Sequence, residues 1–367
     1  MSVILKKPAY ELFLGAIKRE STRECYTRTL RAFMRFANLE SYEVLAKEDP
    51  DTVTDQLESW VISLKEKNLK RGSISNKLNS VELFLAVNRM IWHKKVVRMQ
   101  LPSDNEIPGG EKPFTEEEVF KLLSACANPR EKCLVHYFSS TGARPASIID
   151  PDPLRVGDLY DIEDCYGIQI YDDSKERYWA FLTPEARKAF DSYIAARKRN
   201  GEQITSNSPL FHNIGDNAKT ESLNLSNLYR IFRKLIRKAE IERKKATDKR
   251  FDIAIIYGLR KYYNGILKLN NEVNSNIAEK LMAHKNGLDG HYLKPTMEQC
   301  FNEFKKAIPQ LTIDPNRRNE LLVKTGEVKT MKKSKLEELI KLETLKTICS
   351  LSTEEFLAIQ KKLGTKD

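Results

Sequence analysis

Hydrophobic residues in the first hundred positions recur every three or four residues, which is the spacing of one face of an α-helix. Three runs keep this spacing: Tyr26, Leu30, Phe33 and Ala37; Leu57, Val61 and Leu64; and Leu78, Val81, Leu85 and Met90. Ser21 to Glu24 has the sequence of an N-terminal capping box, so the first of these helices is expected to begin there. The third is expected to run from about Ser73 to Trp92. The pattern predicts a helical domain over residues 1–100.

The next stretch, residues 101–113, is polar and punctuated by Pro and Gly, and it predicts an interdomain linker. Residues 114–313 then predict a second domain made mostly of helices. These are expected from a capping box at Thr115, in the apolar run Leu134 to Ser140, from Thr183, from about Ser226 and on both sides of Arg260. Residues 164–182 instead alternate and are rich in Ile, Tyr and Trp, which predicts a small antiparallel sheet with its turn at residues 172–175. The predicted fold class is mainly α with a small antiparallel β-sheet.

The last part of the chain, residues 314–367, changes character again. Residues 325–335 are polar and rich in lysine, and two capping boxes follow, at Ser334 with Glu337 and at Ser352 with Glu355. The two short helices that these boxes predict are too small for a hydrophobic core of their own. We expect a C-terminal tail that serves as an oligomer contact or a loosely held appendage.

Charge narrows the choice of partner. The chain of 367 residues has 62 Lys+Arg and 51 Asp+Glu, a net charge of +11, and 41% hydrophobic residues. This hydrophobic content is that of a globular protein, and the positive charge favours a polyanion, most commonly nucleic acid. Basic residues surround the predicted N-terminal helices: Arg19, Arg23, Arg28, Arg31, Arg35, Lys65, Lys67, Lys70, Arg71 and Lys77. They fit either an ordinary solvated helix surface or a clamp on the phosphates of double-stranded DNA.

Other classes of protein are disfavoured by what the sequence lacks. The six cysteines include no C-x-x-C pair, so neither a zinc site nor a disulfide framework is expected. The N-terminal apolar run is too short for a signal peptide, and no run of about 18 apolar residues predicts a membrane span. A cytoplasmic location is expected.

Two arginines and a tyrosine carry the candidate chemistry. Arg260 lies in a β-branched and aromatic segment, Ala254 to Tyr263, which is predicted to be buried. A buried guanidinium is unfavourable unless an anion meets it. Arg144 lies upstream in Thr-Gly-Ala-Arg, and Tyr292 lies downstream. This order suggests a phosphate group that is held by two arginines and attacked by a tyrosine.

The motifs that carry these residues resemble the tyrosine recombinase (phage integrase) family. They are Thr141-Gly142-Ala143-Arg144, Tyr257-Gly258-Leu259-Arg260-Lys261, and Leu281-Met282-Ala283-His284 followed by Tyr292. The Leu-Arg-Lys-Tyr-Tyr form of the second motif is most similar to the archaeal branch. The resemblance covers residues 8–310 and implies a helical core-binding domain followed by an α+β catalytic domain. It also implies a site-specific DNA recombinase of mobile elements, nucleoid-associated in a prokaryotic or virus-infected host cell. Such an enzyme works as a homo-tetramer on two DNA sites, without a cofactor or metal.

The resemblance also implies roles for single residues. Arg144 and Arg260 would neutralise the two non-bridging oxygens of the scissile phosphate. Tyr292 would attack the phosphorus and form a covalent 3′-phosphotyrosyl bond. Lys175, at the predicted hairpin turn, would protonate the 5′ leaving oxygen. His284 would bind the phosphate or position the nucleophile.

Three positions depart from the family's pattern. Tyr257 stands where a histidine usually opens the second motif, and Lys261 replaces another frequent histidine. Tyr257 can hydrogen-bond a phosphate but is a poor general base at neutral pH. Ser147 stands where an acidic residue is often found. The proton transfers could therefore be shared among Tyr257, Lys261, His284 and His291.

Two other functions and one structural alternative stay open at this point. A type IB topoisomerase shares the catalytic chemistry, but the helical domain before the linker favours a recombinase. A catalytically inactive DNA-binding relative would be expected to lack some of these residues. In the recombinase family a segment after the nucleophile commonly docks on a neighbouring protomer. An apolar face formed by Phe301, Phe304, Ala307 and Ile308 could do so here, or could pack against its own chain.

Overall fold

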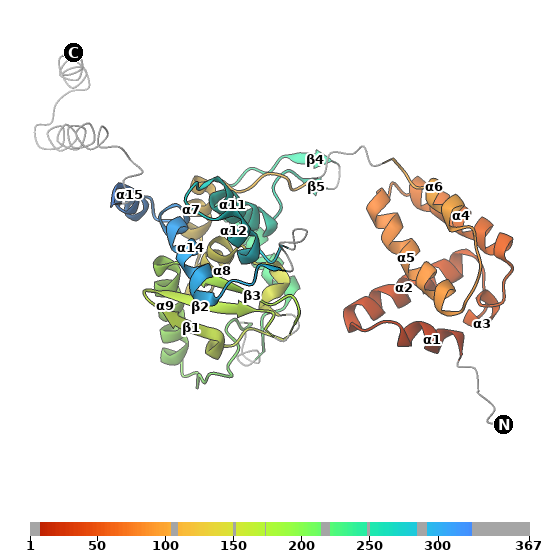
Figure 1. Ribbon diagram of the computed structural model, residues 1–367, viewed down its shortest axis with the longest axis horizontal. Helices are drawn as coiled ribbons and strands as arrows, with labels where there is room; N and C mark the ends of the chain where they lie inside the picture. The colour runs from red at the N-terminus through yellow and green to blue at the C-terminus, as the bar shows by residue number, and fades with distance from the viewer. Residues whose placement is uncertain are drawn as a thin grey trace, which may run out of the picture. The chain divides into compact units, whose positions relative to one another are not determined.

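The computed structural model describes residues 8–103, 109–149, 152–172, 174–213, 221–247, 250–284 and 292–324. The chain divides into two compact units, Met1–Ile107 and Pro108–Asp367, which are described separately. Figure 1 shows unit 1 as a group of helices, and unit 2 as helices packed around a small sheet. The predicted fold class is confirmed.

Unit 1 is entirely helical in its described part. Its elements are α1 (Ala9–Gly15), α2 (Glu20–Phe36), α3 (Tyr42–Leu45), α4 (Pro50–Glu66), α5 (Arg71–Val87) and α6 (Lys94–Met99). The predicted apolar faces form its core, in which Leu30, Phe33, Leu57 and Leu85 are fully buried. Burial of these side chains, at about 1.5–3 kcal/mol each, provides the main stabilisation of the bundle.

The ends of the unit 1 helices differ from the prediction in two places. The capping box expected at Ser21 does not form, because α2 begins at Glu20 and its N-cap is Arg19, whose side chain accepts no capping hydrogen bond. The third predicted helix ends earlier than Trp92, at Val87, and α6 follows as a separate helix. Asn88 ends α5, and its side-chain amide donates to the carbonyls of Phe84 and Ala9.

Unit 2 contains two antiparallel sheets and a surrounding set of helices. The three-stranded sheet has the order β1 (Leu159–Ile162), β2 (Cys165–Ile170) and β3 (Tyr178–Leu182), and a two-stranded ribbon joins β4 (Lys245–Thr247) to β5 (Arg250–Phe251). The helices are α7 (Glu116–Ser124), α8 (Pro129–Thr141), α9 (Pro184–Arg199), α10 (Leu225–Lys238), α11 (Tyr257–Leu269), α12 (Ser275–Leu281), α14 (Met297–Leu311) and α15 (Pro315–Lys324), with 3-10 turns at Pro145–Ile148 and Val156–Asp158. The sequence predicted β2 and β3 but not β1, β4 or β5.

Helix α8 is the central element of unit 2. It is buried along nearly its whole length and packs against α7, α9, α11 and β3. The ring of Phe181 in β3 packs against Phe301 and Phe304 of α14. The predicted capping box at Thr115 is present at the start of α7, where the Thr115 hydroxyl accepts from Glu118 N and the Glu118 carboxylate accepts from Thr115 N. These elements fix both ends of α8 relative to the sheet.

The C-terminal helices decide between two alternatives that the sequence left open. Phe301, Phe304 and Ala307 are at most 2% exposed and lie in the core of unit 2, so they are not a docking face for another protomer. This face packs against its own chain, because Phe181 of β3 contacts Phe301 and Phe304. Helix α15 also belongs to unit 2, since Arg318 donates to the Thr312 carbonyl and forms an ion pair with Glu116. The two short helices predicted beyond residue 325 lie outside the described residues.

Two further findings concern the described residues alone. They include no helix long and apolar enough to cross a bilayer. They also include no group of three His, Cys, Asp or Glu side chains arranged to hold a metal ion.

Candidate functional site

Gly142, at the end of helix α8, positions Arg144, and no other residue could replace this glycine. Gly142 caps α8 in the left-handed conformation, with φ of 57°. A Cβ atom at this position would lie 2.3 Å from Cδ1 of Tyr263, well inside contact distance. The chain can therefore turn here only with glycine. The turn leads directly to Arg144, which is half-buried.

Arg260 lies in the first turn of α11 and is held by backbone carbonyls. Its Nη1 donates to the Gly142 carbonyl and its Nη2 to the Met282 carbonyl, each over 2.6 Å. The residue is 7% exposed, so the prediction that it is buried is confirmed. Burial lowers the pKa of Arg260, with the nearby charge of Arg144 contributing in the same direction, yet a guanidinium remains charged at neutral pH. The side chain is a fixed cation that joins the ends of α8 and α12.

His284 continues this network beyond Arg260. Its Nε2 lies 3.0 Å from Arg260 Nη2, and its Nδ1 lies 2.6 Å from Glu279 Oε2. Because a guanidinium can only donate, Nε2 accepts and Nδ1 carries the proton. Glu279 also forms an ion pair with Lys268. The four side chains make one continuous chain that sets the tautomer and direction of the imidazole.

The carboxylate of Glu279 is well stabilised in its charged form. Burial raises its pKa, but hydrogen bonds from Lys268 and His284 outweigh this effect, and the pKa lies below its usual range. Glu279 was not predicted from the sequence as a site residue. The signal for it lies in its position, five residues before His284 at the end of a short helix.

The backbone at Ala283 explains how His284 returns to Glu279. Ala283 has φ of 54°, in the left-handed region that favours glycine. With this turn, His284 N donates to the Glu279 carbonyl and Ala283 N to the Lys280 carbonyl, which is the Schellman pattern of a helix C-terminus. An alanine in this conformation is strained by about 1–2 kcal/mol. Strain of this kind is common at functional sites.

Arg144, Lys175 and His284 line one cavity of about 890 Å³. Its other lining residues are Gln169, Glu176, Arg177, Tyr178, Trp179, Lys280, Ala283, Leu293, Lys294, Pro295 and Cys300. Basic side chains in this set outnumber the single acidic one. Such a lining attracts an anion and favours phosphate, which arginine binds through two parallel hydrogen bonds.

Lys175 lies on the turn between β2 and β3, as predicted. It is exposed at the rim of the cavity. Ser174 organises the turn, because Ser174 N donates to the Tyr171 carbonyl, Arg177 N donates to the Ser174 carbonyl and Glu176 N donates to the Ser174 hydroxyl. The turn thus holds a lysine on a short, hydrogen-bonded support.

Tyr292 lies beside this cavity, and its ring does not line it. The residue is 81% exposed, while the three residues that follow it, Leu293 to Pro295, belong to the cavity wall. Tyr257, the first residue of α11, is 44% exposed and lies one helical turn before Arg260 without lining the cavity. His291 lies outside the described residues.

Three other positions take structural roles. Lys261 Nζ donates to the Glu111 carbonyl over 2.8 Å and does not line the cavity. Ser147 is buried and hydrogen-bonds the Tyr137 hydroxyl over 3.0 Å, which places it in the core. Tyr263 is fully buried against Gly142 and cannot reach a substrate in this conformation.

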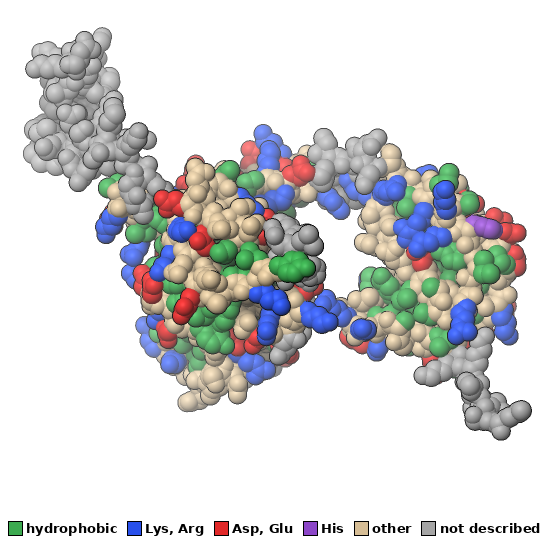
Figure 2. Space-filling model, in the orientation of Figure 1, with side chains coloured by type: hydrophobic (Ala, Val, Ile, Leu, Met, Phe, Trp, Pro, Cys, Tyr) green, Lys and Arg blue, Asp and Glu red, His purple; other side chains and the backbone are tan. Residues whose placement is uncertain are grey.

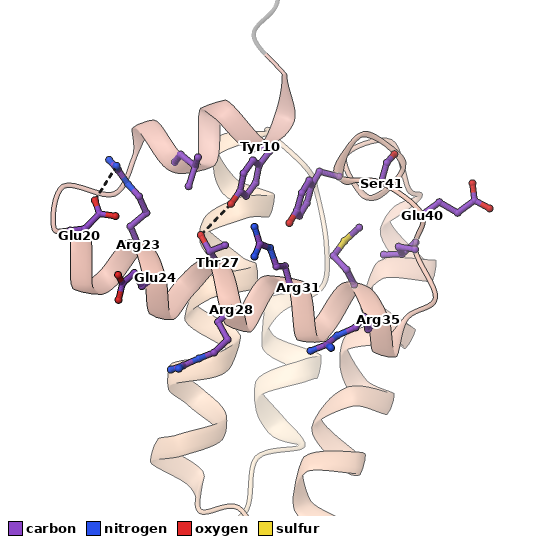
Figure 3. Close-up of a pocket in the computed structure, with 14 residues that line it drawn as sticks. Tyr10, Glu20, Arg23, Glu24, Thr27, Arg28, Arg31, Arg35, Glu40 and Ser41 are labelled. Carbon is purple, nitrogen blue, oxygen red and sulfur yellow. Dashed lines mark hydrogen bonds and ion pairs between the residues drawn. The ribbon is translucent and has the colours of Figure 1, made fainter. Parts of the chain in front are cut away.

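Unit 1 carries a second basic site, a groove of about 990 Å³ along α2. Figure 3 shows Arg28, Arg31 and Arg35 projecting from successive turns of the helix, with Glu20 and Glu40 near the two ends. Its lining residues are Tyr10, Leu14, Glu20, Arg23, Glu24, Thr27, Arg28, Arg31, Met34, Arg35, Leu39, Glu40, Ser41 and Tyr42. We call this surface the α2 groove.

The three central arginines of the α2 groove are exposed. Arg23 is engaged within the protein, since it pairs with Glu20 over 3.1 Å. Arg28, Arg31 and Arg35 form no ion pair with the described residues, but a hydrogen bond with Tyr42 raises the pKa of Arg31. Lys and Arg side chains are visible on the surfaces of both units in Figure 2. Positive charge thus lies at the cavity of unit 2 and along α2 of unit 1.

No protein-family model and no curated protein sequence matches the chain. Among solved structures, it is similar to the Tn1549 transposon integrase in complex with a circular intermediate DNA. The identity is 16%, the TM-score is 0.54, and the match covers 82% of this chain and 99% of that one. It is also similar to a lambda integrase dimer bound to a COC′ core site, with 13% identity, a TM-score of 0.51 and coverage of 78% and 95%. The chain shares the fold of these integrases, which is that of the tyrosine recombinases.

Proposed function

We propose that the protein is a site-specific DNA recombinase or integrase that cleaves and rejoins DNA through a covalent 3′-phosphotyrosyl intermediate. The observation that carries this proposal is the joint placement of Arg144, Lys175 and His284 around one basic cavity, with Arg260 bonded to His284. The three residues that follow Tyr292 belong to the cavity wall, and we infer that the exposed Tyr292 hydroxyl reaches a phosphate bound there. The shared fold supports the same reading.

The chemistry of the proposed reaction follows from these side chains. The Tyr292 oxygen forms a bond to phosphorus, and the bond from phosphorus to the 5′ oxygen breaks. With its Nε2 lone pair released from Arg260, His284 would take the phenol proton, while Lys175 would protonate the leaving oxygen. Arg144 and Arg260 would stabilise the charge that develops on the two non-bridging oxygens. Tyr257, one turn before Arg260, would donate a further hydrogen bond to the phosphate.

The two units would have different roles in the reaction. We assign DNA binding to the helical core-binding domain, residues 1–100, through the α2 groove. We assign DNA cleavage to the catalytic domain, residues 114–313. Each arginine of α2 that contacts a phosphate would add salt-sensitive affinity. Residues 101–113 would be the linker and residues 314–367 the tail.

The family's way of working suggests the assembly. We propose a homo-tetramer that holds two DNA sites, acting on the DNA of a mobile element in the cytoplasm, at the nucleoid of a prokaryotic or virus-infected host cell. The Leu-Arg-Lys-Tyr-Tyr sequence that begins at Leu259 favours the archaeal branch of the family. The positive charge of +11 supports a DNA partner.

A suicide DNA substrate tests the proposed function. The duplex should carry the terminal sequence of the genetic element that encodes the protein, with a nick close to the cleavage site so that the cleaved end diffuses away. We expect a protein–DNA complex that survives SDS and joins the protein to the 3′ phosphate. Absence of this complex across the element's ends would overturn the proposal. Relaxation of any supercoiled plasmid at equimolar protein, without site dependence, would instead indicate a type IB topoisomerase.

A further inference from the structure

Tyr178 is a buried residue of the cavity to which neither the sequence nor the proposed mechanism assigns a role. It is the first residue of β3, three residues after Lys175, and it pairs with Ile170 of β2. The residue lines the cavity together with Arg144 and His284, yet it is only 7% exposed. Its ring lies 6.3 Å from the ring of Tyr171.

The hydroxyl of Tyr178 is buried without a hydrogen bond of normal geometry. Leaving a buried hydroxyl unpaired destabilises the folded state. A phenylalanine would avoid this cost while keeping the same packing. Burial raises the pKa of Tyr178, against the opposing charges of Arg260 and Arg144 and a hydrogen bond of poor geometry with Arg260, so the phenol stays protonated at neutral pH. An unpaired buried polar group in a cavity calls for a functional explanation.

The two arginines near this hydroxyl are held very differently. Arg260 donates to two carbonyls and contacts His284, so its position is fixed. The side chain of Arg144 makes no hydrogen bond to the described residues, although it is half-buried and lines the cavity. Arg144 and Tyr178 line the same cavity, so a guanidinium that turns within the cavity can meet the hydroxyl. A guanidinium that has only donors and a hydroxyl oxygen that accepts are complementary.

We propose that Tyr178 is a positioning residue for Arg144. When Arg144 turns onto a phosphate in the cavity, one of its N–H groups donates to the Tyr178 hydroxyl oxygen, which fixes the plane of the guanidinium. The inference rests on the proposed function, because the phosphate is the scissile one. A phenylalanine at this position would pack equally well but could not accept this hydrogen bond.

The first measurement is the thermal stability of Tyr178→Phe with and without inorganic sulfate, which has the shape of a phosphate group. The unfolding midpoint without sulfate is expected to stay the same or rise, because an unpaired hydroxyl has been removed. Sulfate should raise the midpoint less for Tyr178→Phe than for the wild type. Tyr193→Phe is the matched control, since the Tyr193 hydroxyl is also buried without a partner but lies away from the cavity. An equal response to sulfate in all three proteins would overturn the inference, whether or not the protein cleaves DNA.

The second measurement is the single-turnover rate of adduct formation in a double-mutant cycle. Loss of one hydrogen bond to a charged group predicts a rate about 10- to 100-fold lower for Tyr178→Phe, with unchanged DNA affinity. Because Tyr178 acts through Arg144, the same substitution should have no further effect in an Arg144→Ala background. Equal effects in both backgrounds would contradict the positioning role while leaving the proposed function standing. A wild-type protein that forms no adduct would count against the proposed function alone, and the sulfate measurement would then decide the role of Tyr178.

Discussion

Glu279 Oε2 lies 2.6 Å from His284 Nδ1, and the opposite nitrogen of the same imidazole lies 3.0 Å from Arg260 Nη2. The carboxylate thus decides which nitrogen of His284 faces the buried arginine. This contact links a residue with no predicted role to two that the sequence singled out. It also gives the imidazole a fixed direction before any ligand binds.

We expect Glu279→Gln to weaken the site without unfolding the protein. An amide can accept from Nδ1 only as a neutral group, so the hydrogen bond loses its charge assistance, with a loss of about 1.5–3 kcal/mol in the network. The rate of adduct formation should fall more than DNA affinity does. Single-turnover cleavage and fluorescence anisotropy with the same DNA would separate the two effects.

The same substitution carries a pH signature. The folded-state pKa of Glu279 is lowered, so its carboxylate contributes stability above its ordinary pKa and loses that contribution as pH falls through the lowered value. The stability difference between wild type and Glu279→Gln should therefore be largest near neutral pH and shrink in acid. Urea unfolding at several pH values measures it. A stability difference that grows as pH falls would contradict the predicted direction of this pH dependence.

Ala283→Gly should stabilise the protein. Alanine is strained at φ of 54° by about 1–2 kcal/mol, and glycine adopts this conformation freely. The greater entropy of an unfolded glycine offsets part of the gain, which leaves an expected net increase of about 0.5–1 kcal/mol. Gly15→Ala is the reverse substitution and serves as a comparison, because Gly15 lies in a helix and has open space around it. Calorimetry would reveal a lower midpoint for Ala283→Gly if the strain were absent.

Arg144→Ala and Arg260→Ala should each slow cleavage by about 100-fold or more, the usual loss when one donor to a developing oxyanion is removed. Their consequences for folding should differ. Arg260 joins the carbonyls of Gly142 and Met282, so its removal should also lower stability, whereas Arg144 has no such bonds. Rates and unfolding midpoints measured on the same preparations test both statements. Equal losses of DNA affinity and cleavage rate would show that both arginines only bind DNA and do not stabilise the transition state.

The α2 groove should control DNA affinity. Replacing Arg28, Arg31 and Arg35 one at a time with Ala should weaken binding uniformly across sequences, and each should reduce the slope of log K against log salt by about 0.9. Lys121→Ala is the control, because this lysine is exposed but paired with Glu117 in unit 2. Salt titrations of binding would refute the assignment if the control and the groove variants behaved alike.

Local signals in the sequence predicted much of the fold. The capping box at Thr115 forms as expected because all its partners lie within four residues. The box at Ser21 fails, since the preceding residues continue the helix back to Glu20. Strand β1 was missed because Tyr160 and Asp161 are both exposed and the strand shows no alternation of buried and exposed residues.

The site was predictable only where a motif carries it. Arg144, Lys175 and His284 were expected to act together, and the structure brings them to one cavity. Glu279 and Tyr178 were missed for a physical reason. Glu279 reaches His284 because of a left-handed turn at Ala283. Tyr178 is notable because its buried hydroxyl has no hydrogen bond of normal geometry. Neither feature can be predicted from residue spacing.

Mapping the DNA-linked residue tests the central claim most directly. The wild-type protein is trapped on the suicide duplex, digested with trypsin, and the nucleotide-bearing peptide is sequenced by mass spectrometry. We predict that the modified residue is Tyr292, and that Tyr292→Phe binds the DNA with unchanged affinity but forms no adduct, because only the nucleophilic hydroxyl is lost. An adduct on His291 or on any other residue, or a Tyr292→Phe protein that forms the adduct at the wild-type rate, would contradict the account.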